Sequence, residues 1–338
     1  MGDTVRAVVA EALGGPDVLA VRDDWPTPRP GAGQVAIAVQ AAGVNFAETM
    51  SRRVGYLGAA PPFVPGLEVA GTVCAVGEGV SDVSIGDRVC ALTLTGGYAD
   101  VALARAAATF PLPSGVDFLV GSALPVIVPT AYAMLHPLGR ISRGDRVLVS
   151  SAAGGTGMIL GQMGKHAGAR QLTGIVSSQA KVAAAARYGF DVVLTADEAE
   201  AGGVGDASFD LVLDGVGGPA RELARRATAP LGRLLLYGNS GGTPEAPLTA
   251  ASLRHDNVMV GGWSLTTLAR SDPQLLRSIT ADAFALIAQG AVTLDVRHVF
   301  SLADAGQAHR LVESGESTGK VVLEIGAGSG SVRNTSGG

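Results

Sequence analysis

Short apolar runs separated by glycine, proline and aspartate dominate the first third of the chain. Strand-like runs occur at residues 5–10, 34–44, 69–77, 87–92 and 98–104. Turn-forming segments lie between them, as in PRPGAG at 28–33 and GEGVSDVSIGD at 77–87. Short apolar runs bounded by such turns are typical of β-strands. Residues 4–125 are therefore predicted to form a compact, mostly antiparallel β domain.

From about residue 126 the pattern changes to buried strands that alternate with helices. Strands are predicted at 145–152, 171–178, 191–195, 209–217, 233–239 and 258–265. Helical apolar spacing lies between them, at 157–168, 179–189 and 218–229. Strands joined through helices form βαβ units, and such units build a parallel sheet. We therefore expect an α/β fold with a doubly wound parallel sheet in the middle of the chain.

The last part of the chain has a mixed pattern. An amphipathic helix is predicted over 272–290, followed by strand, helix and strand over 294–325. Residues 327–338 are rich in glycine and serine, which predicts a flexible tail. The pattern alone does not assign 272–325 to either of the two domains.

Composition excludes several classes of function. The net charge is −5 and no stretch concentrates lysine and arginine, so neither nucleic acid nor an anionic membrane is an expected partner. No apolar run reaches about 18 residues, and the N-terminus lacks the pattern of a secretory signal. The two cysteines, Cys74 and Cys90, fit a reducing compartment. We therefore expect a cytoplasmic protein whose partner is a small-molecule substrate.

The segment SSAAGGTG at 150–157 follows a predicted strand and opens a predicted helix. It fits the dinucleotide fingerprint G-x-G-x-x-G, with Ala152 in place of the first glycine. A missing side chain lets the backbone approach a pyrophosphate, and the N–H groups of a helix N-terminus point at it. The alternative role of these glycines is tight helix–sheet packing. The cofactor-binding candidates are Ala153, Gly154, Gly155, Thr156 and Gly157.

The next predicted strand indicates which dinucleotide binds. An NAD site places Asp or Glu on the ribose about 20 residues after the fingerprint. Here the strand ends in Ser177 and Ser178, and Lys181 follows one turn later. Hydroxyls and an ammonium group can bind a 2′-phosphate, and no carboxylate repels it. The sequence therefore favours NADPH over NADH, although Lys181 could also be an ordinary solvated lysine.

Taken in order, the motifs resemble a known family. They are AAGVNFAETMSRRVGY (41–56), VPGLEVAGTVCAVGEGV (64–80), GDRV (86–89), SSAAGGTG (150–157), VLDGVGG (212–218), YGNSGG (237–242) and TGKVVLE (318–324). Over about residues 5–325 the chain resembles the quinone oxidoreductase, zeta-crystallin-like branch of the zinc-independent medium-chain dehydrogenase/reductases. The resemblance implies a GroES-like catalytic domain over 1–125 plus 266–326. It also implies an inserted Rossmann NADPH-binding domain over 126–265 and an active site in the cleft.

Two positions in this resemblance bear on metal binding. Zinc alcohol dehydrogenases carry a cysteine ligand where this chain has Asn45, and a histidine where it has Leu67. The five histidines are scattered, whereas zinc needs three or four ligands close together. We therefore expect no metal. Without a Lewis acid, the expected reaction is hydride transfer to a quinone or an α,β-unsaturated carbonyl compound.

The resemblance also implies the remaining site residues. Tyr56 and Asn45 match the positions nearest the nicotinamide and are the catalytic candidates; the alternative role of Tyr56 is a pocket wall. Asn45 is expected to orient the ribose or nicotinamide. The other cofactor-binding candidates are Thr130, Val216, Asn239, Ser240, Ser264 and Lys320. We interpret Glu68, Asp87 and Asp214 as turn or network residues, and Tyr98 as core.

Alternative functions remain at this point. Residues 238–242 satisfy G-x-S-x-G, the nucleophile elbow of hydrolases, but Pro244 and Pro247 oppose the helix that should follow. A non-catalytic NADPH-binding protein of structural or regulatory type is a second alternative. Quinone reductase and enone or enoyl reductase are not distinguished by the sequence. The apolar strand at 258–265 should end the parallel sheet, and we expect a homodimer through that edge.

Overall fold

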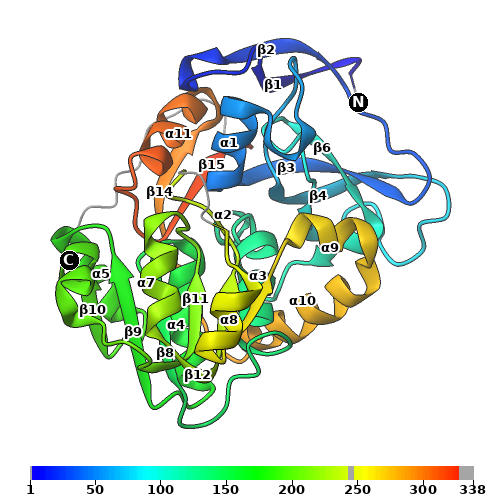
Figure 1. Cartoon of the computed structure of the whole chain (residues 1–338). Coiled ribbons are helices and arrows are strands. Elements are labelled where there is room, and N and C mark those ends of the chain that lie inside the picture. Colours follow the sequence, from blue (N-terminus) through cyan, green and yellow to red (C-terminus); the bar gives the residue numbers. More distant parts are fainter. Residues whose placement is uncertain (1, 243–246, 327–338) are drawn as a thin grey trace. The chain divides into compact units, whose positions relative to one another are not determined.

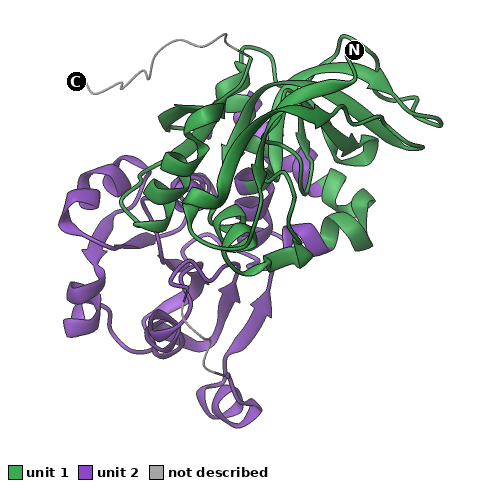
Figure 2. Cartoon of the chain, turned by 90° about the horizontal axis from the view of Figure 1, so that it is seen from above, with its two compact units in different colours: residues 1–126, 268–278, 294–338 green, residues 127–267, 279–293 purple. Residues whose placement is uncertain are grey.

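The computed structural model describes residues 2–242 and 247–326 and divides into two compact units, coloured separately in Figure 2. Unit 1 comprises Met1–Val126, Leu268–Ser278 and Leu294–Gly338, and unit 2 comprises Ile127–Thr267 and Ile279–Thr293. The assignment expected from the sequence differs at 279–293, which it placed in the first domain. Within unit 2 the side chain of Gln162 exchanges hydrogen bonds of 2.9 Å with the backbone N–H and carbonyl of Thr293. The predicted tail lies outside the described residues.

Unit 1 is built on a mixed β-sheet, of which β3, β4, β6, β14 and β15 are labelled in Figure 1. Its strand order is β14-β15-β3-β4-β5-β7, and β6 also pairs with β3. A separate hairpin is formed by β1 and β2. The strands are β1 Thr4–Ala10, β2 Leu19–Pro26, β3 Gln34–Val44, β4 Glu68–Val76, β5 Arg88–Leu92, β6 Val101–Arg105, β7 Thr109–Pro111, β14 Val296–Ser301 and β15 Lys320–Glu324. The helices that lie wholly in unit 1 are α1 Phe46–Val54, α2 Phe118–Gly121 and α11 Ala305–Glu313, with 3₁₀ turns η1 Pro16–Val18, η2 Tyr56–Gly58, η3 Ala106–Ala108 and η6 Leu302–Asp304. The pairs are antiparallel except β14 with β15.

The C-terminal strand β15 lies beside the central strand β3. Val321 is opposite Val44 in this antiparallel pair, so Lys320 comes next to the chain that leaves β3 at Asn45. Alternate residues of β3 enter the core, because successive side chains of a strand point to opposite faces. Val35, Ile37 and Val39 are buried in the same cluster as residues of β15 and α11. The fold thus brings distant parts of the sequence to the end of β3.

Unit 2 contains a parallel sheet of six strands in the order β10-β9-β8-β11-β12-β13. The strands are β8 Arg146–Val149, β9 Gln171–Val176, β10 Val192–Thr195, β11 Phe209–Asp214, β12 Thr228–Leu236 and β13 Met259–Gly262. The helices from residue 124 to 288 are α3 Leu124–Leu135, α4 Gly155–His166, α5 Val182–Arg187, α6 Ala196–Glu198, α7 Pro219–Ala227, α8 Ala250–Asp256, α9 Leu265–Ser271 and α10 Pro273–Ala288, with η4 Gln179–Lys181 and the π-turn η5 Ala199–Gly203. All five strand pairs are parallel, which confirms the predicted doubly wound sheet.

Helix α4 approaches the sheet closely because one of its faces is made of glycine. A Cβ on Gly161 would lie 2.3 Å from the carbonyl oxygen of Tyr188, and one on Gly164 would lie 2.8 Å from Leu172. A Cβ on Gly157 would lie 2.3 Å from the carbonyl oxygen of Ser151. Backbone atoms cannot move away easily, so Gly157 and Gly161 accept only glycine in this packing, whereas a Cβ on Gly164 would displace the end of the Leu172 side chain. The packing role and the fingerprint role of Gly157 are therefore compatible.

Two parts of the predicted element pattern need correction. The strand predicted at 258–265 is shorter, because Ser264 accepts a hydrogen bond from Thr267 N and thereby begins α9. Helix α1 was not predicted, although Glu48 accepts the backbone N–H of Asn45 as in a capping box. In the described part of the chain, no helix is long and apolar enough to cross a membrane.

Candidate cofactor and active site

In unit 2 the strand order changes direction at β8. The chain runs outward from β8 to β9 and β10 on one side, and then to β11, β12 and β13 on the other. Ligands of open α/β sheets bind at the carboxyl ends of the strands beside such a switch point. The loops that follow β8, β9, β11 and β12 carry most of the residues expected from the sequence to bind the cofactor.

The loop after β8 leads into the N-terminus of α4. Gly154 is the N-cap residue with extended backbone angles, and its carbonyl accepts the first helical hydrogen bond, from Met158 N. The N–H groups of the three preceding helical residues therefore have no partner one turn earlier in this helix. No acidic side chain lies in the first turn. This end of α4 has the charge and the N–H groups that an anionic phosphate requires.

Asp214, at the end of β11, organises the next loop. It is completely buried, and its carboxylate accepts hydrogen bonds from Ser150 Oγ at 3.1 Å, Val216 N at 2.9 Å and Gly217 N at 3.0 Å. Arg221 of α7 pairs with its other oxygen at 3.1 Å. The interpretation of Asp214 as a network residue agrees with these bonds. Arg221 was not singled out by the sequence, because its partner is known only once α7 is in place.

The loops after β11 and β12 lie side by side. Ser240 N donates to Gly215 O at 3.0 Å, and Gly241 N donates to Val216 O at 2.9 Å. A Cβ on Gly217 would lie 2.4 Å from Oδ1 of Asn239. The structure therefore brings Val216, Asn239 and Ser240 together, as expected for one binding edge. The described residues after Ser240 form no helix before α8, which opposes the hydrolase alternative.

The candidates for 2′-phosphate recognition follow β9, the neighbour of β8. Ser177 and Ser178 are exposed, and Lys181 is half-buried at the end of η4. Lys181 N donates to Ser178 O at 3.1 Å, which closes the turn. Neither aspartate nor glutamate occurs in residues 177–190. The end of β9 therefore offers hydroxyls and one ammonium group in a stretch of sequence that contains neither Asp nor Glu.

Thr130 of α3 and Ser264 have different surroundings. Thr130 is buried, and its hydroxyl oxygen accepts a hydrogen bond from Trp263 Nε1 at 3.1 Å. Trp263 follows β13 and was not singled out by the sequence, since nothing local links it to α3. Ser264 Oγ lies 2.8 Å from Thr267 Oγ1 and caps α9. No described contact joins Ser264 to Thr130.

Unit 1 contains a buried polar cluster around Asn45. Lys320 Nζ donates to Asn45 Oδ1 at 2.5 Å and to Glu68 Oε1 at 2.6 Å. Asn45 Nδ2 donates to Glu68 at 3.0 Å and to Glu48 at 3.2 Å. Burial raises the pKa of Glu48 to about 7, while the Lys320 ammonium group acts to lower it. Glu48 was missed by the sequence analysis, although the spacing N-x-x-E could have indicated it.

Tyr56 lies outside this cluster. It begins η2 after Gly55, whose φ of 71° ends α1 in the left-handed region. Its side chain is 49% exposed, and among the described residues no hydrogen bond or ion pair joins it to Asn45. Tyr98 is completely buried, as predicted, and its hydroxyl lies 3.2 Å from Nε2 of His309. The proposed role of Tyr56 thus depends on a ligand rather than on contacts within the protein.

The described residues contain no group of three or more histidine, cysteine, aspartate or glutamate side chains placed to hold a metal ion. The cation beside Asn45 and Glu68 is instead the ammonium group of Lys320, whose side chain is 3% exposed. A cation at that position satisfies the Glu68 carboxylate, which is itself completely buried.

Comparisons with known families cover both units. The alcohol dehydrogenase GroES-like domain matches residues 31–114, and the family described as zinc-binding dehydrogenase matches residues 188–323. The mostly antiparallel sheet of unit 1 and the parallel sheet of unit 2 agree with this pairing of a GroES-like domain with a Rossmann domain. Both results confirm the fold class expected from the sequence.

Individual relatives give the same result. The quinone oxidoreductase of Rattus norvegicus is 31% identical over 94% of this chain and 97% of its own length. The structure of mycobacterial Rv1454c complexed with NADPH is 34% identical, covers 95% of this chain and 100% of that chain, and has a TM-score of 0.86. The highly-reducing polyketide synthase 1 of Aureobasidium melanogenum is 31% identical over 94% of this chain, which spans only 14% of that much longer protein.

Proposed function

This chain belongs to the quinone oxidoreductase branch of the medium-chain dehydrogenase/reductase superfamily, and we propose that it is an NADPH-dependent reductase of quinones or α,β-unsaturated carbonyl compounds. The observation that carries the proposal is the N-terminus of α4 beside the loops after β9, β11 and β12. These loops present glycine backbone, helix N–H groups and hydroxyls at one edge of the sheet. That combination suits a dinucleotide.

NADPH is the proposed cofactor because of the residues at the end of β9. The mycobacterial relative was solved with NADPH. In this chain Ser177, Ser178 and Lys181 supply donors for a 2′-phosphate, and Lys181 is the one cation among them. The other proposed contacts are Ala153, Gly154, Gly155, Thr156 and Gly157 for the pyrophosphate, with Thr130, Val216, Asn239, Ser240 and Ser264 along the same unit.

The test of cofactor choice is a pair of dissociation constants for NADPH and NADH, measured by fluorescence. Lys181→Ala should weaken NADPH by roughly 10- to 100-fold, the scale of a lost hydrogen bond to a charged group, and leave NADH nearly unchanged. Arg187→Ala, which removes an exposed cation from the end of α5, is the matched control. Equal affinities for the two cofactors, or equal losses in the two variants, would contradict the proposal.

When bound, the nicotinamide supplies the hydride, and negative charge develops on the carbonyl or quinone oxygen of the substrate. We propose that Asn45 and Lys320 orient the nicotinamide end and that the Tyr56 hydroxyl donates a hydrogen bond to the developing charge. Tyr56 is 49% exposed, and the described hydrogen bonds include none made by its hydroxyl. The alternative, in which Tyr56 only shapes the pocket, predicts no change in rate when its hydroxyl is removed.

We also propose that the reaction needs no metal ion. Asn45 and Leu67 stand where zinc dehydrogenases have ligands, and Lys320 supplies the local positive charge. Elemental analysis of active protein should find no stoichiometric zinc. Activity that a chelator abolishes and zinc restores would contradict this assignment.

The substrate class rests on family membership, so the assay must separate its alternatives. Purified protein should consume NADPH with members of a panel of quinones, enones and enoyl thioesters. Turnover of one class assigns the reaction. NADPH binding without turnover of any class would instead favour the non-catalytic alternative, a structural or regulatory NADPH-binding protein.

We propose a homodimer formed through β13, the last strand of the parallel sheet. Leu231 and Met259 are 77% and 53% exposed there. They help to line a shallow pocket of about 360 Å³ formed by Leu231, Leu253, Arg254, Asn257, Val258 and Met259. A twofold copy would pair the open edges of two sheets and cover these side chains.

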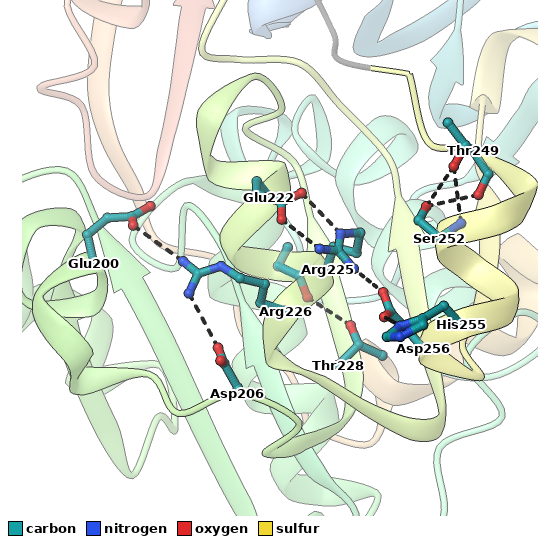
Figure 3. A network of polar contacts seen from close by, with 11 residues as sticks. Glu200, Asp206, Glu222, Arg225, Arg226, Thr228, Thr249, Ser252, His255 and Asp256 are labelled. Carbon is teal, nitrogen blue, oxygen red and sulfur yellow. Dashed lines mark hydrogen bonds and ion pairs between the residues drawn. The ribbon is translucent and has the colours of Figure 1, made fainter.

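Helix α8, which precedes β13, is held by polar contacts with α7 and by its own N-cap (Figure 3). Arg225 of α7 pairs with Glu222 at 2.7 Å and with Asp256 of α8, and Thr249 caps α8.

Light scattering should give twice the chain mass of 33.9 kDa at micromolar concentration. Met259→Lys should produce monomers, whereas Leu275→Lys, at an exposed leucine of α10, should not. A monomeric wild-type protein would contradict the proposal.

A further inference from the structure

The cluster at the end of β3 uses both hydrogen-bond donors of the Asn45 side chain. Its Nδ2 group gives one N–H to Glu48 Oε1 at 3.2 Å and the other to Glu68 Oε1 at 3.0 Å. Its Oδ1 accepts from Lys320 Nζ at 2.5 Å. A side-chain amide has two N–H donors and two acceptor lone pairs. One lone pair on Oδ1 is therefore the hydrogen-bonding capacity that the described contacts leave to Asn45.

This orientation of the amide cannot be reversed without large electrostatic cost. A flip would place the NH₂ group against the Lys320 ammonium and the oxygen against two carboxylates. Glu48, Glu68 and Lys320 are only 2%, 0% and 3% exposed, so water does not screen these charges. The flipped amide would lose its hydrogen bonds and face like charges on both sides.

The two carboxylates are themselves held by backbone groups. Glu48 accepts Leu67 N at 3.1 Å and Asn45 N at 3.1 Å, and Glu68 accepts Val126 N at 2.8 Å. A Cβ on Gly43 would lie 2.3 Å from Glu68 Oε1, so this carboxylate reaches Asn45 through space that only a glycine leaves open. The orientation of the Asn45 amide is thus fixed by rigid elements of unit 1 and not by solvent.

We infer that Glu48 and Glu68 are positioning residues that restrict Asn45 to the role of hydrogen-bond acceptor toward a bound ligand. The ligand group that Asn45 recognises is then a donor, such as a sugar hydroxyl or a carboxamide N–H, and never a bare carbonyl or phosphate oxygen. This inference rests on the proposed function, in which Asn45 contacts the cofactor. It adds the direction of that contact and the residues that impose it.

The arrangement favours an ionised Glu48. All three of its hydrogen-bond neighbours are N–H donors, so a protonated carboxyl group would accept from them more weakly and would find no acceptor among them for its own O–H. The titratable groups around it are Glu68 on β4, Lys320 on β15 and Tyr98, whose pKa both carboxylates help to raise. Since burial raises the pKa of Glu48 to about 7, the amide should be fully held above neutral pH and loosened below it.

Hydrogen exchange at the Asn45 side chain tests this without any cofactor. The chain has four asparagines, Asn45, Asn239, Asn257 and Asn334, so selective ¹⁵N-asparagine labelling gives few signals, and Asn45→Ser assigns the relevant pair. At about pH 8 the Asn45 amide protons should exchange at least about 10-fold more slowly than those of exposed Asn257, the scale of one hydrogen bond to a charged group. The ratio of the Asn257 exchange rate to the Asn45 exchange rate should fall toward one as the pH drops below about 6.

Glu48→Gln should lower this ratio at about pH 8, because the new NH₂ group faces donors. Glu324→Gln, which removes a half-buried carboxylate of β15, is the matched control and should leave the ratio unchanged. A ratio near one in the wild-type protein, or equal ratios in Glu48→Gln and wild type, would overturn the inference. The wild-type pH series keeps the test valid if Glu48→Gln does not fold.

NADPH binding separates this inference from the proposed function. The dissociation constant should rise about 10-fold at about pH 8 in Glu48→Gln, and its dependence on pH should disappear. Protected Asn45 protons in a protein that binds no NADPH would refute the proposed function and leave the amide orientation standing. Tight NADPH binding with unprotected Asn45 protons would refute the inference alone.

Discussion

His309 should make unit 1 sensitive to acid, and His309→Gln should remove that sensitivity. The imidazole is completely buried on α11; its Nε2 lies 3.2 Å from the Tyr98 hydroxyl, and no partner contacts Nδ1 among the described residues. Burial, with the nearby charge of Arg52, lowers the pKa of His309 to about 3. A protonated ring would need a buried counter-charge, and the one charge that acts on His309 among the described residues is that of Arg52, which has the same sign.

The magnitude follows from the two pKa values. In the unfolded chain histidine takes up a proton near pH 6.5, whereas folded His309 does so only near pH 3. Between these values the unfolded state binds more protons, so the free energy of unfolding falls as the pH falls. A pH of about 5 lies about 1.5 units below the pKa of the unfolded chain. The free energy of unfolding is therefore about 2 kcal/mol lower there than at high pH.

Glu48 acts in the opposite direction over the same range. Its pKa of about 7 lies above the usual 4.5, so the folded state holds the proton more tightly, and stability from this group rises as the pH falls from about 7 to 4.5. At about pH 5 this contribution is about 2.5 kcal/mol. The contributions of His309 and Glu48 to the pH dependence of unfolding should nearly cancel in the wild-type protein. A variant that lacks one of the two groups should therefore show the pH dependence caused by the other.

Urea unfolding at about pH 5 and about pH 7.5 measures these effects. The chain has two tryptophans, so a Trp263→Phe background leaves Trp25 as a fluorescence probe of unit 1. Relative to wild type, His309→Gln should gain about 2 kcal/mol on going to the lower pH, and Glu48→Gln should lose about as much. His166→Gln, at an exposed histidine, is the control. An equal change in the free energy of unfolding between the two pH values in His309→Gln and wild type would contradict the assigned role of His309.

Three further predictions concern packing, the loop network and the reaction. Gly161→Ala should destabilise unit 2 by about 2 kcal/mol in urea unfolding, because its Cβ meets the Tyr188 carbonyl, whereas Gly262→Ala, with open space around it, should be neutral. Asp214→Asn should lower the free energy of unfolding by about 3 kcal/mol and weaken NADPH binding, because the buried carboxylate accepts hydrogen bonds from several groups at once. Unchanged NADPH affinity would show that the loop after β11 does not need the carboxylate for binding. Tyr56→Phe should lower kcat by roughly 10- to 1,000-fold with little change in NADPH affinity, and unchanged rates and product stereochemistry on every substrate would leave Tyr56 as a pocket wall.

Local sequence patterns predicted much of the fold because the relevant physics is local. The apolar run at 34–44 coincides with β3, and the alternation of strands and helices after residue 126 predicted the parallel sheet. The fingerprint at 150–157 placed α4 and its N-terminus correctly, since the glycines, the turn and the helix start are neighbours in the chain. Helix α1 was missed because a single capping pair, Asn45 with Glu48, gives a weak signal beside a strong strand.

The strand–helix order, the anion-binding turn after β8 and the lack of acid after β9 are therefore properties of local sequence. The tertiary fold sets which polar side chains meet. Lys320 reaches Asn45 and Glu68 because β15 pairs with β3, and Trp263 reaches Thr130 because β13 ends beside α3. Such contacts join residues far apart in the chain, where no periodicity or spacing relates them. Their strength also depends on burial, which removes the water that would otherwise screen the charges and satisfy the amide.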